Sequence, residues 1–513
     1  MSLTHPEDLR ETLGIPFSTQ QLDAITAPLE PGVIIAGAGS GKTTVMAARV
    51  VWLVGSGQVR PEQVLGLTFT RKAAAELGGR VRRALLAAGV LDADAEAGEE
   101  LILTYDAFAG RLVAEHGLLL GIEGNARLIT TAARFRLAAR VVAETAGLEH
   151  LSRLRPAAVA QRVLELSAEL RSHLVDPAQL RGHAEEFTRA LASAPRNPRG
   201  AEYAALQMAR AAAAERLEVA ALVERYEALK VELGYVEFAD QMAAAARLAT
   251  EVPAVAVALR GEFAVVLLDE YQDTSAAQAT LLRALFSGAE PATGRGHPVT
   301  AVGDPCQAIY GWRGAAASNI LDFAHHFPRA DGLPARSYAL TVNRRSGQQV
   351  LDAANELAAN VRADPVLAAY GLDLDLVAPE GTPRGRVEVA GYATWPEEVA
   401  GLADRVAALH DTGAVRAWSD VAVLARRNTQ VADVYAELAA RDIPAEIVGL
   451  GGLLELPPIA DVVATLTVLD DPTANPAMLR LLTSPRWAIG IPDLALLGRR
   501  ARDLSEAKGA PSA

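Results

Sequence analysis

Lysine and cysteine are nearly missing from this sequence of 513 residues. Lysine occurs only as Lys42, Lys72, Lys230 and Lys508, so arginine supplies almost all of the positive charge. Cys306 is the single cysteine, which excludes an internal disulfide framework and favours a reducing, cytoplasmic location. No apolar run reaches the ~18–20 residues that a membrane-spanning helix needs, so we expect no membrane partner.

Positive charge is also in deficit, with 49 Lys and Arg against 62 Asp and Glu and a formal net charge of −13. This balance argues against broad non-specific nucleic-acid binding but leaves room for a local basic groove. The first eight residues lack the charged start and apolar stretch of a secretory signal. The nine histidines show no metal-ligand spacing. The length is sufficient for two or more domains.

A glycine-rich loop follows a short apolar run near the N-terminus. The run predicts a buried strand, and the Lys-Thr-Thr after the loop predicts a helix start, so backbone N–H groups converge where nucleotide phosphates bind. Lys42 can reach the β- and γ-phosphates, and the Thr43 hydroxyl can ligate Mg²⁺. The first pattern position is Ala36, where glycine is usual. We therefore expect the cofactors ATP and Mg²⁺ at Ala36, Gly37, Ala38, Gly39, Ser40, Gly41, Lys42, Thr43 and Thr44.

Two carboxylates follow a second apolar run, Phe263–Leu268. Ligands of an open parallel sheet bind at the carboxyl ends of its strands, so Asp269 is expected beside the phosphate loop, within the Mg²⁺ shell. Glu270 is then placed to orient or deprotonate the attacking water. An apolar strand followed by acids is also common at simple turns. The phosphate loop and the Tyr271-Gln272-Asp273-Thr274 that follows favour the catalytic interpretation.

A third polar loop begins after the apolar run Val299–Val302. Within it, Gln307 can touch the γ-phosphate, and Tyr310, Trp312 and Arg313 follow closely. Aromatic rings and arginine beside a phosphate sensor suit stacking on unpaired bases, which contributes about 1–3 kcal/mol per base. The alternative for Trp312 is packing in a domain interface.

The hydrophobic pattern changes along the chain. Strand candidates at Val33–Ala36, Val64–Phe69 and Leu101–Thr104 indicate an α/β unit, and residues 111–255 instead show long alanine- and leucine-rich helical patterns. Strand character returns at Phe263–Leu268 and Val299–Val302, which would complete the first sheet from distant residues. A second α/β region is expected from about 335, with a helical region after Pro457. Its strand candidates are Tyr338–Leu340, Val387–Gly391, Val421–Ala425 and Glu446–Val448, and its helix candidates are Pro396–Leu409 and Gln430–Arg441.

The order of these motifs resembles a superfamily 1 DNA helicase of the UvrD/Rep/PcrA type, the motor type also found in RecB-like and AdnA/AdnB proteins. Phe17–Ile25 is similar to the adenine-reading Q motif, which assigns Gln21 to the base. Thr68–Ala74 resembles a DNA-contacting motif that implies contacts by Phe69 and Thr70, and Thr104–Phe108 corresponds to the next one, with Thr104 as the contact.

The segment Asn343-Arg344-Arg345-Ser346 stands where this family carries an Asn-aromatic-Arg-Ser motif. The resemblance implies that Arg345 contacts the γ-phosphate. The aromatic residue that stacks on adenine is replaced by Arg344, whose guanidinium plane can also stack on a base. A surface charge cluster is the alternative for this arginine pair.

The resemblance implies two RecA-like P-loop domains with parallel sheets and two all-α insertions, an α/β fold. The later Lys-Gly-Leu-Glu and Thr-Arg-Ala segments of the family are absent, so we expect the N-terminal portion of a longer reading frame with a truncated second insertion. The expected domains are RecA-like domain 1A at 1–110 and 256–334, helical insertion 1B at 111–255, domain 2A from 335 to 456, and the start of helical domain 2B at 457–513.

The function implied is an ATP-dependent DNA helicase that moves 3′→5′ on single-stranded DNA, with duplex junctions as substrates, in DNA repair or recombination. A second helicase–nuclease subunit is a further partner that the resemblance leaves open. One alternative is an ATP- and DNA-binding subunit with weak or no activity, because motifs V and VI are missing. A nucleotide kinase with the same phosphate loop is another, against which the Tyr/Trp/Arg block argues.

Overall fold

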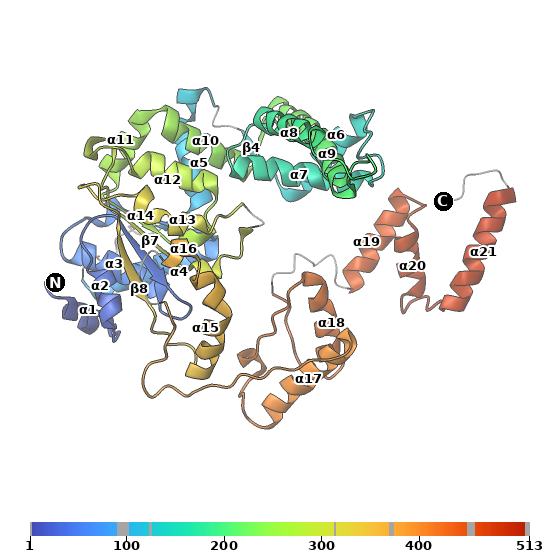
Figure 1. Cartoon of the computed structure of the whole chain (residues 1–513). Coiled ribbons are helices and arrows are strands. Elements are labelled where there is room, and N and C mark those ends of the chain that lie inside the picture. Colours follow the sequence, from blue (N-terminus) through green and yellow to red (C-terminus); the bar gives the residue numbers. More distant parts are fainter. Residues whose placement is uncertain are drawn as a thin grey trace. The chain divides into compact units, whose positions relative to one another are not determined.

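The computed structural model describes residues 3–89, 102–122, 126–311, 314–368, 374–448 and 457–507. The chain divides into two compact units, Met1–Val387 and Glu388–Ala513. The first unit contains a parallel sheet covered by helices together with a helical insertion, and the second unit is built from helices and extended segments (Figure 1).

Six parallel strands form the sheet of the first unit, in the order β3-β2-β6-β7-β1-β8. Four of them, β1, β2, β6 and β7, are buried along their whole length, as expected for a parallel sheet covered on both faces. The strands are β1 (Gly32–Ala36), β2 (Val64–Thr68), β3 (Ile102–Thr104), β6 (Val265–Leu268), β7 (Val299–Gly303) and β8 (Arg336–Leu340).

The return of strand character after the helical stretch was predicted correctly. Residues 265–268 and 299–303 join the sheet between β2 and β1. The loop with Asp269 and Glu270 and the loop with Gln307 therefore begin at the same sheet edge as the glycine-rich loop. The prediction for Tyr338–Leu340 was wrong in one respect. This strand forms, but β8 pairs with β1 at the edge of the first sheet, because Arg336–Leu340 finds its hydrogen-bonding partner there.

The two faces of the sheet bury separate apolar cores. Along β1, Val33 and Ile35 point into one core and Ile34 and Ala36 into the other, which follows the period-two alternation of a strand. One face is covered by α1 (Pro6–Leu13), α2 (Thr19–Ile25), α3 (Lys42–Gly55) and α4 (Arg71–Ala87). The other is covered by α5 (Tyr105–His116), α10 (Phe238–Glu251), α11 (Pro253–Glu262), α12 (Ala276–Phe286), α13 (Ser318–Leu321) and α14 (Phe323–His326).

The helical insertion has its own apolar core, which includes Leu137, Val163 and Tyr226. Its helices are α6 (Thr131–Glu144), α7 (Pro156–Ser172), α8 (Pro177–Ala192) and α9 (Ala204–Glu232). Short strands β4 (Arg127–Leu128) and β5 (Tyr235–Val236) pair in parallel at its base. The predicted all-α character of this region is therefore confirmed apart from that pair.

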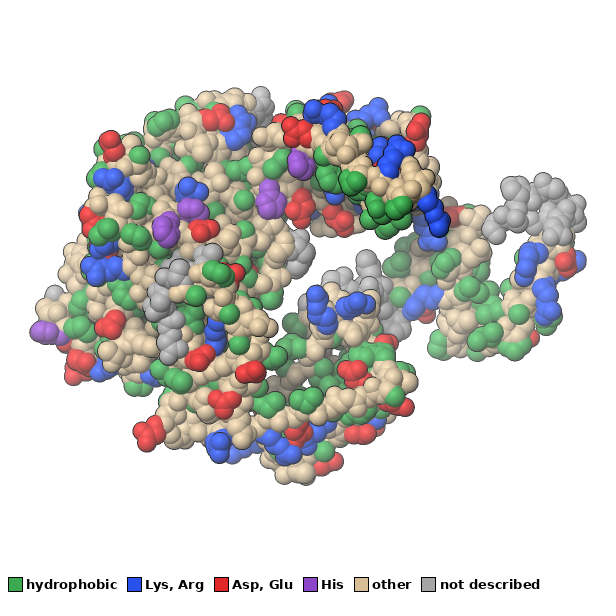
Figure 2. Space-filling model, in the orientation of Figure 1, with side chains coloured by type: hydrophobic (Ala, Val, Ile, Leu, Met, Phe, Trp, Pro, Cys, Tyr) green, Lys and Arg blue, Asp and Glu red, His purple; other side chains and the backbone are tan. Residues whose placement is uncertain are grey.

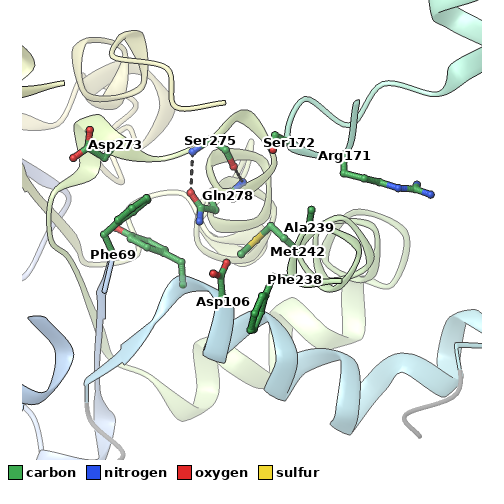
Figure 3. A pocket seen from close by; sticks show the side chains of 11 residues that line it. Phe69, Asp106, Arg171, Ser172, Phe238, Ala239, Met242, Asp273, Ser275 and Gln278 are labelled. Carbon is green, nitrogen blue, oxygen red and sulfur yellow. Dashed lines mark hydrogen bonds between the residues drawn. The ribbon is translucent and has the colours of Figure 1, made fainter. Parts of the chain in front are cut away.

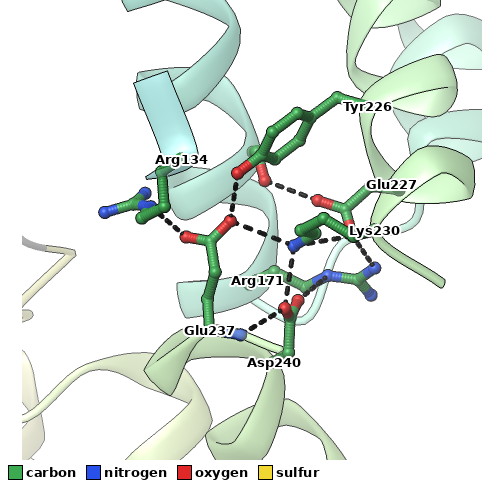
Figure 4. Close-up of polar contacts among 8 residues, drawn as sticks. Arg134, Arg171, Tyr226, Glu227, Lys230, Glu237 and Asp240 are labelled. Carbon is green, nitrogen blue, oxygen red and sulfur yellow. Dashed lines mark hydrogen bonds and ion pairs between the residues drawn. The ribbon is translucent and has the colours of Figure 1, made fainter. Parts of the chain in front are cut away.

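A buried ion network joins the insertion to α10 (Figure 4). Lys230 is 2% exposed, and its Nζ lies 3.1 Å from Glu227, 3.1 Å from Glu237 and 2.7 Å from Asp240. Burial lowers the pKa of Lys230, but the three carboxylates outweigh it and raise the pKa above its usual value. Such a network stabilises the chain only while every charge keeps its partner. Arg134, Arg171 and Tyr226 bind the same carboxylates.

The second unit carries a small apolar core between two helices, formed by residues such as Val399, Val406 and Leu438. Its helices are α17 (Trp395–Asp411), α18 (Asn428–Ala439), α19 (Pro457–Asp470), α20 (Asn475–Thr483) and α21 (Ile491–Ala507). The predicted helices at 396–409 and 430–441 and the helical region after 457 are confirmed. The linking helices α15 (Gln348–Arg362) and α16 (Pro365–Ala368) belong to the first unit.

The strands predicted at Val387–Gly391, Val421–Ala425 and Glu446–Val448 are wrong for this structure. Each of these segments is described, but none is part of a strand. Their apolar patterns suit a pleated surface, yet a strand exists only where another strand accepts its backbone hydrogen bonds. Val389 and Val448 are accordingly almost fully exposed.

Within the described ranges, no single helix is long and apolar enough to cross a membrane, and only the pair α10 and α11, bent by 97°, passes on length and composition. On the face drawn in Figure 2, Lys and Arg side chains are interspersed with Asp and Glu rather than gathered in one basic patch.

Candidate functional site

The glycine-rich loop links the end of β1 to the start of α3. Gly41 adopts a left-handed conformation (φ 88°) immediately before Lys42, the first residue of the helix, and Gly39 does the same (φ 67°). The Ser40 hydroxyl donates to the Gly37 carbonyl at 2.7 Å, which closes the loop on itself. As predicted, a helix therefore begins directly after the loop, at the edge of the sheet where β1 ends. The N–H groups of the first turn of a helix have no partner within the helix and can bind an anion.

Asn343, just after β8, holds the loop from the other side. Its Nδ2 donates to the Ala38 carbonyl at 2.6 Å, and its Oδ1 accepts the N–H groups of Arg345 and Ser346, both at 2.8 Å. The Arg344 N–H donates to the Gly39 carbonyl at 3.0 Å. The Asn-Arg-Arg-Ser segment is thus hydrogen-bonded to the phosphate loop, although the two are 305 residues apart in sequence.

The two arginines of this segment are both exposed. The Arg344 guanidinium donates to the Pro16 carbonyl, directly before the Phe17–Ile25 segment. This places Arg344 beside the residues expected to read adenine. The roles of Arg344 on the base and of Arg345 on the γ-phosphate stay predictions.

Gln21 is buried beneath the phosphate loop. Its Oε1 accepts the Ser18 N–H at 2.9 Å as part of the capping box of α2, and its Nε2 donates to the Ser40 carbonyl at 2.9 Å. Both ends of the amide are therefore used within the protein, where they support the loop. The neighbouring Gln20 instead binds Thr341 through both ends of its amide. Contact between Gln21 and adenine stays a prediction.

Asp269 and Glu270 lie at the carboxyl end of β6, beside Lys42. The Lys42 Nζ is 3.8 Å from Glu270 Oε2. Asp269 is buried, and the Thr68 hydroxyl donates to its Oδ2 at 3.3 Å. Burial and the adjacent Glu270 carboxylate raise the pKa of Asp269 to about 6, against the opposing effects of Thr68 and Lys42. Lys42, Asp269 and Glu270 therefore form one cluster, as predicted.

This cluster fits a divalent cation. The Oδ1 atom of Asp269 is buried and has no hydrogen-bond partner among the described residues. A buried carboxylate oxygen without a partner is costly unless a cation compensates it. Thr43, in the first turn of α3, is only partly exposed and supplies a hydroxyl. Asp269 and Thr43 are hence the residues that would hold Mg²⁺, a hard cation that prefers oxygen ligands.

Gln307 follows β7 at the same sheet edge. Its Nε2 donates to Asp304 Oδ2 at 2.6 Å, and Asp304 Oδ1 accepts the Cys306 N–H at 2.9 Å. Cys306 is exposed as a residue, but partial desolvation of its thiol, together with the nearby Asp304, raises the pKa of that thiol. A raised thiol pKa disfavours the reactive thiolate.

Two of the residues expected to contact DNA stack on each other. The ring centroids of Phe69 and Tyr310 are 4.9 Å apart, with 25° between the ring planes. Phe69 also lines a cavity of about 220 Å³ between the sheet edge and the helices (Figure 3), together with Asp106, Phe238, Met242 and Asp273. Trp312 and Arg313 lie outside the described residues.

Thr70 and Thr104 both cap helices. The Thr70 hydroxyl accepts the Ala73 N–H at the start of α4, and the Thr104 hydroxyl accepts the Ala107 N–H at the start of α5, each at 3.1 Å. These caps explain why threonine suits both positions without any ligand. Each hydroxyl keeps its own proton to donate, so the predicted DNA contacts remain compatible with the caps.

Sequence reasoning gave no role to several residues that shape this site. Asn343 binds the phosphate loop, Gln272 binds Glu270, and Asp304 binds Gln307. The signal was present in each case, since these polar residues lie within three positions of a predicted site residue. Only the fold shows which of their amide and carboxylate groups turn inward.

Comparison with known proteins places this site in a recognised context. Residues 17–328 match the family model for the UvrD/REP helicase N-terminal domain, and residues 338–504 match that for the UvrD-like helicase C-terminal domain.

Individual relatives agree with these matches. The chain is 29% identical over 503 residues to the ATP-dependent DNA helicase PcrA of Leuconostoc citreum, covering 96% of this chain and 58% of that protein. It is 30% identical over 482 residues to the ATP-dependent DNA helicase UvrD1 of Mycobacterium leprae, covering 92% and 55%. It is 28% identical over 499 residues to UvrD2 of Mycobacterium tuberculosis, covering 95% and 63%. The chain thus spans 55% to 63% of the length of these relatives.

Proposed function

Because the chain belongs to the UvrD/Rep helicase family, we propose that it binds ATP with Mg²⁺ and acts in an ATP-driven motor that moves 3′→5′ along single-stranded DNA. The proposed substrates are single-stranded DNA and duplex junctions that arise in DNA repair or recombination. The relatives are named as ATP-dependent DNA helicases, which supports this assignment.

One observation carries the proposal: the Lys42 ammonium lies 3.8 Å from Glu270 Oε2, at the edge where β1 and β6 end. A triphosphate in the loop would be bound by backbone N–H groups and by the Lys42 ammonium. The Glu270 carboxylate is then close enough to orient a water for attack on the terminal phosphate. Gln307, held by Asp304, faces the same edge.

Magnesium would neutralise phosphate charge when bound, and Thr43 and Asp269 are the ligands that we assign to it. The remaining work falls to the protein. Gly39 and Gly41 allow the backbone to turn toward the phosphates, and Asn343 keeps that turn in place. The Lys42 ammonium would balance the negative charge of the phosphates. Arg345 is the proposed contact for charge that develops on the γ-phosphate.

The proposed binding of single-stranded DNA depends on aromatic rings that stack on its bases. Phe69 and Tyr310 offer ring faces, with Trp312 and Arg313 nearby in sequence, and each base stacked on such a ring gains about 1–3 kcal/mol. Stacking is sequence-tolerant, which suits a motor that moves over any sequence.

The test is Lys42→Ala in the full 513-residue chain. Titration with the fluorescent nucleotide mant-ATP in MgCl₂ should show affinity at least ~10-fold weaker than wild type, the value of one hydrogen bond to a charged group. The matched control is Lys72→Ala, whose side chain is 87% exposed and should leave mant-ATP affinity unchanged. Equal affinity for wild type and Lys42→Ala would overturn the assignment of the site.

A second candidate is an ATP- and DNA-binding subunit with little turnover. The observation that favours it is the lack of strand structure in the described residues of the second unit, where a second sheet was expected. ATP hydrolysis measured with and without single-stranded DNA separates the two candidates. DNA-stimulated turnover that Glu270→Gln removes supports the motor, and binding of both ligands without turnover supports the subunit. Displacement from 3′-tailed but not 5′-tailed duplexes would establish the direction.

A further inference from the structure

Gln272 occupies a buried position between two loops of the proposed ATP site. Its side chain is 1% exposed, and both ends of its amide are bound. The Nε2 donates to Glu270 Oε2 at 2.9 Å and to Asp273 Oδ2 at 3.2 Å, while Oε1 accepts the Asp304 N–H at 3.0 Å. Two carboxylates against one end of the amide require the donor there, so the orientation of the amide is chemically determined.

The Gln272 amide leaves no room for a side chain at position 303. A Cβ at position 303 would lie 2.2 Å from Gln272 Oε1, so the glycine at the end of β7 makes room for the amide. Glu270 itself has a left-handed backbone (φ 48°), an uncommon conformation for a residue with a side chain. The hydrogen bond from Gln272 therefore holds the carboxylate of a residue whose backbone is strained.

Asp273 extends these contacts toward the aromatic pair. The backbone N–H groups of Ile309 and Tyr310 lie close enough to the Asp273 carboxylate to oppose the rise in its pKa that burial causes, and the ring of Tyr310 stacks on Phe69. Asp273 and Phe69 also line the same end of the cavity (Figure 3). Hydrogen bonds thus run from Glu270 through Gln272 to Asp273, and the Asp273 carboxylate lies near the backbone of the loop that carries Tyr310.

A branch of the same series reaches the proposed phosphate sensor. Gln272 binds the backbone of Asp304, and Asp304 binds the Gln307 side chain at 2.6 Å. A movement of Glu270 or Gln307 on nucleotide binding would consequently shift the Gln272 amide. The same amide donates to Asp273, which lies near the backbone of the loop that carries Tyr310.

We propose that Gln272 is a positioning residue that couples the two sites: its amide ties Glu270 and Asp304 to Asp273, so that nucleotide binding changes the affinity of the Phe69–Tyr310 surface for single-stranded DNA. This inference rests on the proposed function, in which these sites bind ATP and DNA. Coupling of this kind is reciprocal, since each ligand changes the affinity for the other by the same factor.

The experiment measures that factor in the full chain. The Kd for a fluorescein-labelled dT₂₀ is determined by anisotropy without nucleotide and with saturating AMP-PNP and MgCl₂, and the ratio of the two values is the coupling ratio. We expect a ratio of at least ~5 in either direction for wild type. For Gln272→Glu we expect a ratio near 1, with each Kd measured alone changing much less, because a carboxylate cannot donate to two others.

The matched control is Gln179→Glu. Gln179 belongs to the capping box of α8, and among the described residues its amide acts only as an acceptor for the Asp176 N–H, a role that a carboxylate can also fill. Its coupling ratio should equal that of wild type. Asp273→Asn is the second variant if Gln272→Glu melts at a lower temperature than wild type, and its ratio should also approach 1.

The outcomes separate the inference from the proposed function. A wild-type ratio of 1 with both ligands bound, or an unchanged ratio in folded Gln272→Glu and Asp273→Asn, overturns the coupling role and leaves the proposed binding sites intact. Failure of wild type to bind AMP-PNP or dT₂₀ overturns both. Loss of the ratio in both variants with retention in Gln179→Glu supports the coupling role.

Discussion

The ring of Phe69 stacks on the ring of Tyr310 with their centroids 4.9 Å apart. Phe69 directly follows β2 and Tyr310 lies in the loop after β7, and these strands are separated in the sheet by β6. The pair therefore bridges two strand ends at the ligand-binding edge. Both rings are only partly buried.

Phe69→Ala should weaken binding of single-stranded DNA about 10-fold, because one stacking face is lost. Anisotropy titrations with fluorescein-labelled dT₂₀ measure this change, and mant-ATP affinity should remain as in wild type. Phe187→Ala is the control, since Phe187 is an exposed phenylalanine of α8 in the helical insertion. Unchanged DNA affinity in Phe69→Ala would exclude this ring as a base contact.

Gly39→Ala should abolish mant-ATP binding, because a Cβ there would lie 2.6 Å from Asn343 Nδ2 and would displace the side chain that holds the loop. The left-handed backbone at Gly39 adds a strain of about 1 kcal/mol.

Gly14→Ala separates these two effects. Gly14 has a similar φ of 63°, but a Cβ there has no atom within 4 Å. It should lose stability of about 1 kcal/mol by urea unfolding while it keeps nucleotide affinity. If both variants keep the nucleotide affinity of wild type, the contact between position 39 and Asn343 does not matter for nucleotide binding.

Lys230→Met should destabilise the chain by about 3 kcal/mol, since it leaves buried carboxylates without their shared ammonium. Urea unfolding followed by circular dichroism measures the loss. Lys72→Met is the control, because its pair with Glu76 is exposed and contributes at most about 1 kcal/mol. A Lys230→Met variant as stable as wild type would show that the network contributes no net stability.

Acidification should destabilise the first unit partly through His297. Burial, with a further contribution from Arg260, lowers the pKa of His297 to about 4, and its ring stacks on Phe286. The unfolded imidazole takes up a proton near pH 6.5 while the folded one stays neutral, so stability is lost as pH falls from about 6.5 to about 4.

His297→Gln should remove about 2 kcal/mol of that pH-dependent loss. Urea midpoints measured from pH 7 to pH 4 give the dependence, and His183→Gln, at an exposed position of α8, is the control. Parallel profiles for wild type and His297→Gln would contradict this role.

Much of the sheet could be predicted from local pattern. β1, β2, β6 and β7 are largely apolar runs, and β1, β6 and β7 end in a glycine-rich or acidic loop, a pattern that indicates buried strands. The strand β8 could be predicted, but its place in the first sheet could not, because a hydrophobic pattern does not show which strand will be its hydrogen-bonding partner. The strands expected in the second unit failed for the same reason, since pattern does not supply a pairing partner.

The candidate site shows the same division. Lys42, Asp269, Glu270 and Gln307 were identifiable because each follows a strand with a recognisable spacing. Asn343 and Gln272 were not, because an amide gains its role only from the groups that the fold brings against it. Gln21, expected at the base, uses its amide to hold Ser40.

The amino-acid sequence alone determined where the phosphate loop, the acidic pair and the buried strands occur, because backbone freedom at glycine and the burial of apolar runs are local properties. The tertiary structure decided which residues meet. The hydrogen bonds from the Asp304 N–H to Gln272 and from Asn343 to the phosphate loop depend on strands that are neighbours in the sheet but separated in sequence. Their energies come from desolvated contacts that exist only after the sheet has assembled.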